Sequence, residues 1–313
     1  MNVISTEDFN VPLSTLDLPK IIMSSPEMPF LEAASLMFEK KIGSLVLGKE
    51  GKISGIFTER DIIKHADLVI NEKKTIQLDK LMTPNPFTIK SDASLLDAIS
   101  IMSSREFRHI PIVDDDGNVI SIISIKDILK YLLSFFENFF SNFKPISYWS
   151  KESVNLQEVA NLYDIEKSRG SLREDVLYTN LKRVGSSNFS FVSHTVTIED
   201  VLQRLHQKSH SVALVTEYET ELAGIVTERD LLFKVFSQDV DLSTSVTEIM
   251  TSNPHILSIE NKLGHALKNM FTYHYRNIPL INTEGFPVSI VTLLDILIFI
   301  GNELGVRNVL QYL

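Results

Sequence analysis

Four segments of the chain share one order of apolar and polar positions. Each has apolar residues, then a serine or threonine, two variable residues and an aspartate, and continues with an apolar pattern of helical period. These segments span residues 55–65, 121–131, 224–234 and 289–299, and their aspartates are Asp61, Asp127, Asp230 and Asp295. Such internal repetition predicts that the chain is built from four copies of one structural unit.

An amphipathic helix is predicted at a nearly constant distance before each segment. Spacings of three and four place the apolar residues of each helix on one face. These residues are Leu31, Ala34 and Met37; Leu95, Ala98 and Met102; Ile198, Val201 and Leu205; and Leu263, Ala266 and Met270. Two short β-rich runs separated by turn residues follow each helix, at 44–47 and 53–57, 110–113 and 119–123, 212–216 and 222–226, and 279–282 and 287–291. Each repeat is therefore predicted as an α/β unit of order β-α-β-β-α.

The spacing of the aspartates indicates a duplicated pair rather than four equal units. Asp61 and Asp230 are 169 residues apart (230 minus 61), and Asp127 and Asp295 are 168 apart (295 minus 127). A unit of about 60 residues cannot cover its own sheet, so neighbouring repeats must share a core. We expect an N-terminal arm at 1–17, a first pair at 18–132 (repeats 18–67 and 76–132), a connector at 133–175, a second pair at 176–300 (repeats 176–236 and 246–300) and a helical tail at 301–313.

The expected connector is partly helical and begins with an aromatic run at 135–143. It also contains the only tryptophan, Trp149. These aromatic residues are expected to pack on their own chain, as most large apolar side chains do. Docking on a second chain is the alternative.

These motifs resemble those of the CBS-domain family, whose repeats occur as tandem pairs. The resemblance rests on the fourfold Gly/Ser-apolar-apolar-Thr/Ser-x-x-Asp motif. It also rests on RHIPIVDDDGNVI at 108–120, echoed by RNIPLINTEGFPV at 276–288, and on LMTPNP at 81–86, echoed by IMTSNP at 249–254. It implies two tandem CBS pairs, in a layout similar to that of the gamma subunit of AMP-activated protein kinase. In the family, clefts between paired repeats bind AMP, ADP, ATP, S-adenosylmethionine or related adenosyl ligands.

The paired hydroxyl and carboxylate of each motif are the candidate ligand-binding groups. An ionised carboxylate accepts two hydrogen bonds, which suits a ribose diol, and a helix N-terminus attracts phosphate. The candidates are Thr58 and Asp61, Ser124 and Asp127, Thr227 and Asp230, and Thr292 and Asp295. The same residues also form a helix capping box, so each pair could serve only to start its helix.

The basic residues near each motif indicate which of the four sites are the stronger candidates for binding phosphate. Arg60 and Arg229 lie inside their motifs, and Lys126 is their equivalent in the second repeat, whereas the fourth repeat has Leu294 and is the weakest phosphate site. By the resemblance, the phosphate-facing residues are Arg108, His109 and Arg276, and a histidine there could add pH sensitivity. Lys41 and His210 are looser matches. The alternative for each is a solvated surface side chain.

Composition narrows the functional classes. The chain has 313 residues with 40 acidic and 30 basic side chains, a formal charge of -10 that disfavours nucleic acid as a partner. It has no cysteine, which excludes thiolate chemistry. No apolar run of about 18 residues predicts a membrane span, and a cytoplasmic location is expected. No metal-binding or catalytic motif is found, so neither an enzyme nor a bound cofactor is expected.

Two functions are compatible with these observations. The first is a regulatory protein that senses an adenine nucleotide and passes its state to an unidentified partner protein or to a homodimer. The second is a constitutive interaction scaffold whose clefts are empty or filled by side chains.

Overall fold

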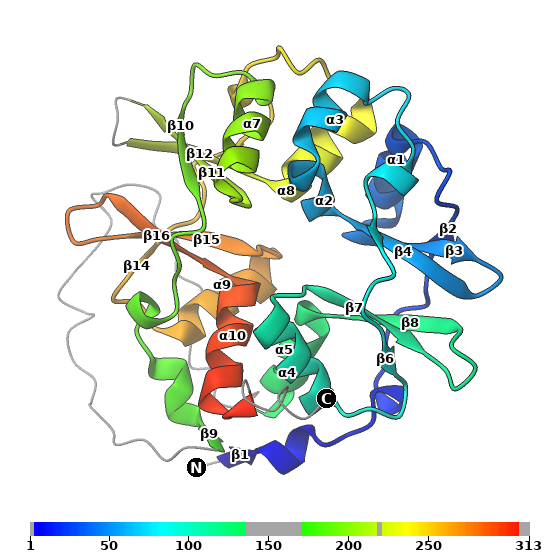
Figure 1. Cartoon of the computed structure of the whole chain (residues 1–313). Coiled ribbons are helices and arrows are strands. Elements are labelled where there is room, and N and C mark those ends of the chain that lie inside the picture. The colour runs from blue at the N-terminus through cyan, green and yellow to red at the C-terminus, as the bar shows by residue number, and fades with distance from the viewer. Residues whose placement is uncertain (1–2, 136–170, 218–220, 307–313) are drawn as a thin grey trace.

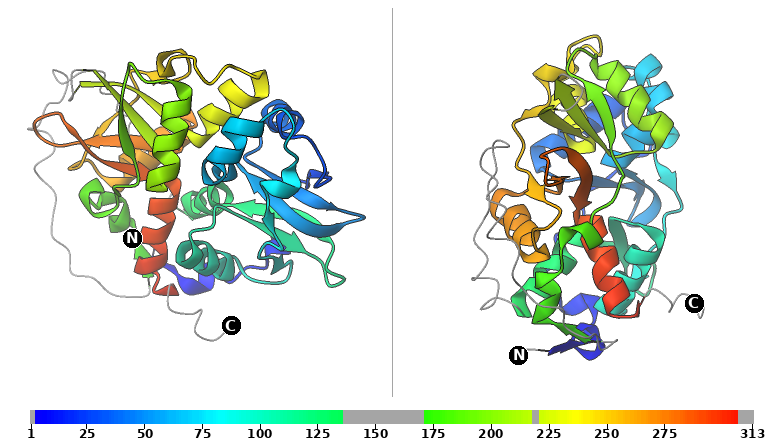
Figure 2. Two further views of the ribbon diagram at one scale, coloured as in Figure 1. Left: turned by 45° about the horizontal axis from the view of Figure 1, so that its top comes forward. Right: turned by 90° about the vertical axis from the view of Figure 1, so that its left-hand side faces the viewer.

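The computed structural model of the chain describes residues 3–135, 171–217 and 221–306. Most of the expected aromatic connector, including Trp149, and residues 307–313 of the expected tail lie outside this part of the chain. The described residues form a flattened disc in which four similar units surround the centre (Figures 1 and 2).

Each unit has the order β-α-β-β-α, which confirms the predicted α/β repeat. The first unit consists of β2 (Met23–Ser24), α1 (Phe30–Lys40), β3 (Ser44–Lys49), β4 (Lys52–Thr58) and α2 (Glu59–Lys64), and α3 (Ala66–Glu72) follows it in the chain. The second consists of β6 (Ile89–Lys90), α4 (Leu95–Arg105), β7 (His109–Val113), β8 (Val119–Ser124) and α5 (Ile125–Phe135). The third consists of β10 (Ser190–Ser193), α7 (Ile198–Lys208), β11 (Val212–Glu217), β12 (Glu221–Thr227) and α8 (Glu228–Asp230), which continues into a π turn (Leu231–Val235). The fourth consists of β14 (Leu257–Ser258), α9 (Leu263–Tyr273), β15 (Asn277–Ile281), β16 (Pro287–Thr292) and α10 (Leu293–Glu303).

The sheets explain why the motif begins with glycine in two repeats and with serine in the others. In each sheet the first strand runs parallel to the second, which forms a hairpin with the third. A fourth strand, β5 (Thr83–Pro84) or β13 (Thr251–Ser252), joins β4 or β12 from the loop that leads into the next repeat. A Cβ at Gly55 would lie 2.2 Å from the sulfur of Met82, and one at Gly224 would lie 2.5 Å from that of Met250. Only glycine allows these methionines to cross the strand.

The first helix of every repeat ends in a left-handed residue that is not glycine. These residues are Lys41, Glu106, Ser209 and His274, with φ between 55° and 61°. Left-handed backbone is unfavourable for a residue with a Cβ, so its recurrence at one position is a built feature of the repeat. The turn directs the chain from the helix into the next strand, whose start lies at the pockets described below.

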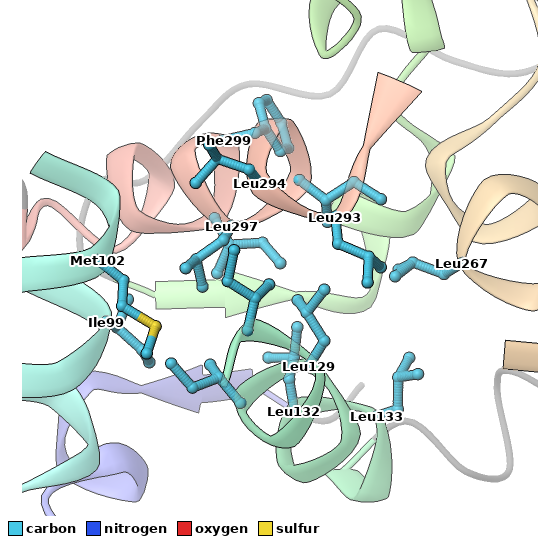
Figure 3. Packing of buried hydrophobic residues seen from close by; sticks show 14 of the residues in the cluster. Ile99, Met102, Leu129, Leu132, Leu133, Leu267, Leu293, Leu294, Leu297 and Phe299 are labelled. Carbon is cyan, nitrogen blue, oxygen red and sulfur yellow. The ribbon is translucent and has the colours of Figure 1, made fainter. Parts of the chain in front are cut away.

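The largest cores lie between the two pairs rather than within them. One cluster joins helices of the first and third repeats, and another joins helices of the second and fourth. Figure 3 shows the second cluster, where leucines of α10 pack against α4 and α5. Within each pair, the facing sheets share only small apolar clusters, such as Val46 with Val113 and Val119. The halves of one chain therefore close on each other through their helices.

In each half, the segment that precedes the first strand of the repeats packs on the second repeat of that half and not on the first. Phe9 and Leu13 are buried in the core of the second and fourth repeats, and so are Leu177 and Leu181, which follow them by 168 residues. The strand β1 (Val3–Ser5) pairs antiparallel with β9 (Ser171–Arg173), which the sequence assigned to the connector. The duplication thus extends into the expected arm. At the other end, α10 ends at Glu303 and Gly305 is left-handed.

Candidate functional site

Two cavities occupy equivalent places in the two halves of the disc. The first-half pocket, of about 530 Å³, is lined by Thr58, Asp61, Phe87 and Phe107 among others. The second-half pocket, of about 340 Å³, is lined by Thr227, Asp230, His255 and Tyr275 among others. Volumes of a few hundred cubic ångströms are typical of sites for small organic ligands.

The predicted motif residues divide unevenly between these pockets. Thr58, Arg60 and Asp61 line the first-half pocket. The second-half pocket is lined by Thr227, Arg229 and Asp230, and also by Ser124, Lys126 and Thr292 from the second and fourth repeats. Asp127 and Asp295 line neither pocket. In the first and third repeats, both the threonine and the aspartate of the motif therefore line a pocket. In the second and fourth repeats only the serine or threonine does.

All four motifs form helix caps. One carboxylate oxygen of Asp61 accepts from the backbone N–H and the hydroxyl of Thr58, both at 2.8 Å. Ser124 with Asp127 and Thr227 with Asp230 make the corresponding contacts. In the fourth motif Asp295 accepts from the Thr292 backbone N–H at 2.8 Å, and the Asp295 backbone N–H donates to the Thr292 hydroxyl at 3.1 Å. The cap uses only one oxygen. The other oxygen of Asp61 is 3.4 Å from the Thr83 hydroxyl, and that of Asp230 is 2.7 Å from Lys234 Nζ.

Burial alters the acidity of two motif carboxyls. It raises the pKa of Asp61 and of Asp295, and hydrogen bonds from Thr58 and Thr292 oppose this change. A carboxylate in such a position favours a ligand that donates hydrogen bonds to it, because these replace lost hydration.

The arginines expected to face phosphates contact buried carboxylates of the opposite half. Arg108 pairs with Glu228 and also donates to the Ser211 hydroxyl at 3.0 Å. Arg276 and Arg229 both pair with Glu59, at 2.8 and 2.9 Å. The side chains of Glu59 and Glu228 are 6% and 4% exposed. Sequence reasoning missed both glutamates, although each follows its motif threonine directly.

Lys41 and His210, the looser basic matches, have fewer contacts at the pockets than the arginines. The backbone carbonyl of Lys41 accepts from Arg229 at 3.3 Å. His210 lines the first-half pocket, and its Nδ1 is 2.9 Å from the Ser190 hydroxyl.

His109 lines both pockets at the centre of the disc. Burial, together with the positive charges of Arg276, Arg108 and Arg229, lowers its pKa to about 3. The imidazole is therefore neutral at physiological pH, so it can donate or accept a hydrogen bond there but carries no charge for a phosphate.

Replacing His109 with asparagine, the residue at the equivalent position 277, should flatten the dependence of stability on pH. The unfolded chain binds a proton at His109 near pH 6.5, whereas the folded chain does so only near 3. The stability associated with His109 is therefore complete above pH 6.5 and falls as the pH drops toward 3. At pH 5 the loss is at most about 2 kcal/mol.

Urea unfolding of wild type and His109→Asn at pH 7 and pH 5 measures this difference. The wild type should lose more stability between the two pH values than the variant does. Equal losses would contradict a His109 that is neutral in the folded chain.

Aromatic residues form one wall of each pocket. Phe87 and Phe107 lie at 6.4 Å between ring centroids in the first half. His255 and Tyr275 lie at 5.1 Å in the second. Each is 168 residues from its equivalent, so the repeat register could have identified these positions. Ile56 and Ile225 also line these pockets.

The first-half pocket also takes residues from the other half of the chain. These are His206, Ser209, His210 and Ser211, at the end of α7 and the turn after it, and Glu228 at the start of α8. The sequence indicates only His210 among them, as a loose basic match in its own repeat, because the contribution to the other half depends on how the halves pack.

No cluster of three or more His, Asp or Glu side chains in the described part of the chain is arranged to hold a metal ion. None of the helices there is long and apolar enough to cross a membrane.

The repeat, its sheet order and its place in a pair point to one family. The CBS domain model matches residues 15–67, 78–134, 181–237 and 246–302, more than half of the chain. The chain belongs to the CBS domain family. The four CBS matches coincide with the four units of the disc, which confirms the resemblance stated from the motifs.

Several curated proteins match most of this chain. The CBS domain-containing protein CBSCBSPB5 of Arabidopsis thaliana is 26% identical over 304 residues, covering 94% of this chain and 54% of the relative. The meiotically up-regulated gene 70 protein of Schizosaccharomyces pombe is 24% identical over 290 residues, covering 84% of this chain and 40% of the relative. The chain spans about half the length of the curated relatives it matches, or less.

A solved structure has the same fold. Protein MJ1225 of Methanocaldococcus jannaschii, described as a candidate archaeal homologue of g-AMPK, matches with a TM-score of 0.65 at 17% identity, covering 90% of this chain and 96% of that one. At this identity the match establishes the CBS architecture alone.

Proposed function

We propose that this protein is a cytoplasmic regulatory sensor that binds AMP, ADP, ATP or a related adenosyl ligand in its two pockets. A change of ligand alters how the CBS pairs sit together, and a partner protein or a second copy of the chain reads that change. Such coupling requires the ligand to bind the two arrangements with different affinity.

One observation carries the proposal. Each pocket combines a motif carboxylate, an aromatic wall and arginines around a cavity of several hundred cubic ångströms. In the first half these are Asp61, Phe87 with Phe107, and Arg60 with Arg108. Three chemically different groups at one cavity match the three parts of a nucleotide.

Each group suits one part of that ligand. The carboxylate of Asp61 or Asp230 accepts hydrogen bonds from the ribose diol. The aromatic and aliphatic walls provide flat apolar faces for the purine. The arginines supply positive charge and paired donors for phosphate.

A constitutive scaffold is supported by a different observation. Arg108, Arg229 and Arg276 already hold internal carboxylates. On this alternative the ion pairs merely lock the halves together, and the protein binds its partner equally well with and without nucleotide.

Asp230→Asn and Asp61→Asn should each weaken nucleotide binding while leaving the helix caps in place. The asparagine side-chain oxygen still accepts from the motif threonine, but the charge and the second acceptor are lost. A hydrogen bond to a charged group contributes about 1.5–3 kcal/mol, so we expect roughly tenfold or greater weakening at the affected pocket.

Titration calorimetry with AMP, ATP and S-adenosylmethionine tests this expectation. The matched control is Asp200→Asn, because Asp200 caps α7 with Thr197 in the same way and lies at neither pocket. Removal of the 2′- and 3′-hydroxyls from AMP should abolish the difference between wild type and Asp230→Asn. Absence of any adenosyl ligand binding at millimolar concentration would overturn the proposed function and leave the scaffold.

A further inference from the structure

Glu59 holds two arginines of the opposite half at the edge of the second-half pocket. Its two carboxylate oxygens lie 2.9 Å from Arg229 and 2.8 Å from Arg276, one arginine on each oxygen. Both arginines line that pocket. The pairing is close to the backbone, since a Cβ at Gly43 would lie 3.0 Å from Glu59 Oε1 and 3.2 Å from an Arg276 nitrogen. Glycine at this position leaves room for the ion pair.

The corresponding contact of the other half is built differently. Glu228 occupies the place of Glu59 but pairs with Arg108 through one oxygen only, while its Oε1 is buried and has no hydrogen-bond partner among the described residues. Ser211 stands where Gly43 stands in the first repeat and contacts Arg108. Arg60, the equivalent of Arg229, makes no ion pair with the described residues and lines the first-half pocket. The duplicated sequence therefore yields two unequal sites.

This difference bears on phosphate binding. In the first-half pocket Arg60 can bind a phosphate without breaking an ion pair with any of the described residues. In the second-half pocket a phosphate that binds Arg229 and Arg276 must replace the Glu59 carboxylate, which would then remain buried without its partners. Removing the partners of a buried charge is strongly unfavourable.

We propose that Glu59 is an internal competitor for the ligand's phosphate, which makes the second-half pocket discriminate against phosphorylated adenosyl ligands. This rests on the proposed function, because it specifies which ligands each pocket takes. Phosphorylated nucleotides fill the first-half pocket first. The second-half pocket gains little from a phosphate and binds AMP and adenosine with similar affinity.

Glu59→Gln tests the competition. The amide is nearly isosteric and still accepts a hydrogen bond, but it no longer neutralises Arg229 and Arg276. In titration calorimetry, the affinity of the second-half pocket for AMP should rise roughly tenfold or more, as expected when charged donors are released. The affinity for adenosine, which has no phosphate, should not change.

Two further variants assign the gain. In Glu59→Gln/Asp230→Asn the gain should disappear, because the second-half pocket has lost its ribose contact. Glu39→Gln removes the same charge from an exposed position of α1 and should leave both affinities unchanged. Glu59→Asp, which keeps the charge and withdraws it by one methylene, should produce a smaller gain than Glu59→Gln.

The outcomes separate the two proposals. Unchanged or weaker AMP binding by a Glu59→Gln or Glu59→Asp variant with wild-type circular dichroism would overturn the competition while leaving the nucleotide site intact. An equal gain for AMP and adenosine would also overturn it, because the effect would not involve the phosphate. If the wild type binds neither AMP nor adenosine, the proposed function and this inference both fall.

Discussion

Replacement of Phe236 by alanine will lower the free energy of unfolding by about 3–5 kcal/mol, the usual effect of removing a buried aromatic ring. Phe236 is 1% exposed and belongs to the core between the first and third repeats. Its ring centroid lies 5.0 Å from that of Phe30 in the opposite half. The truncation therefore opens a cavity at the surface where the two CBS pairs meet.

Urea unfolding followed by circular dichroism measures this effect. Phe191→Ala is the matched control, because Phe191 is 46% exposed on the third repeat and should change stability by less than about 1 kcal/mol. Similar effects of the two truncations would contradict a core shared between the halves. A separate early transition in Phe236→Ala would indicate that the pairs separate before they unfold.

Replacement of Arg108 by methionine will destabilise the protein by about 2–4 kcal/mol, because it leaves the buried Glu228 carboxylate without its cation. The effect is somewhat smaller than for a fully buried pair, since Arg108 is partly exposed and water can reach the vacated space. A surface arginine that served only to attract phosphate would have little effect on stability in the absence of ligand.

The double variant Arg108→Met/Glu228→Gln provides the control. It removes both charges, so most of the lost stability should return, whereas Glu228→Gln alone leaves Arg108 able to turn toward solvent. A double variant as unstable as Arg108→Met would show that packing of the arginine, rather than the buried charge, causes the loss. Thermal unfolding of each variant is then measured with and without AMP. A structural role of Arg108 changes the melting temperature without AMP, whereas a contact with ligand changes the increase that AMP produces.

The motif aspartates show how far sequence reasoning extends. The spacing of Thr58 and Asp61 predicts both a cap and a ribose site, because the two need the same residues. In the structure the aspartate accepts from the backbone N–H of its serine or threonine in all four repeats, but of the four aspartates only Asp61 and Asp230 line one of the two pockets. Local sequence decides the hydrogen bonds within one turn, whereas the cavity requires the neighbouring repeat.

The arginines illustrate the opposite case. The resemblance to the CBS family predicts that Arg108 and Arg276 face phosphates. Their partners, Glu228 and Glu59, lie 120 and 217 residues away along the chain. No periodicity connects residues at such separations, so the pairing could not be predicted.

The sequence by itself determined the repeat, its β-α-β-β-α order, the register of the duplication and the four helix caps. Each of these follows from hydrophobic periodicity or from contacts within a few residues, and such interactions depend only on residues that are close in the sequence. Tertiary structure alone decided that helices of opposite pairs share the main cores and that residues near Phe9 pack on the second repeat. It also decided that Glu59 takes two arginines where Glu228 takes one. These features depend on which apolar faces meet when the duplicated halves close, and equivalent residues then acquire different neighbours.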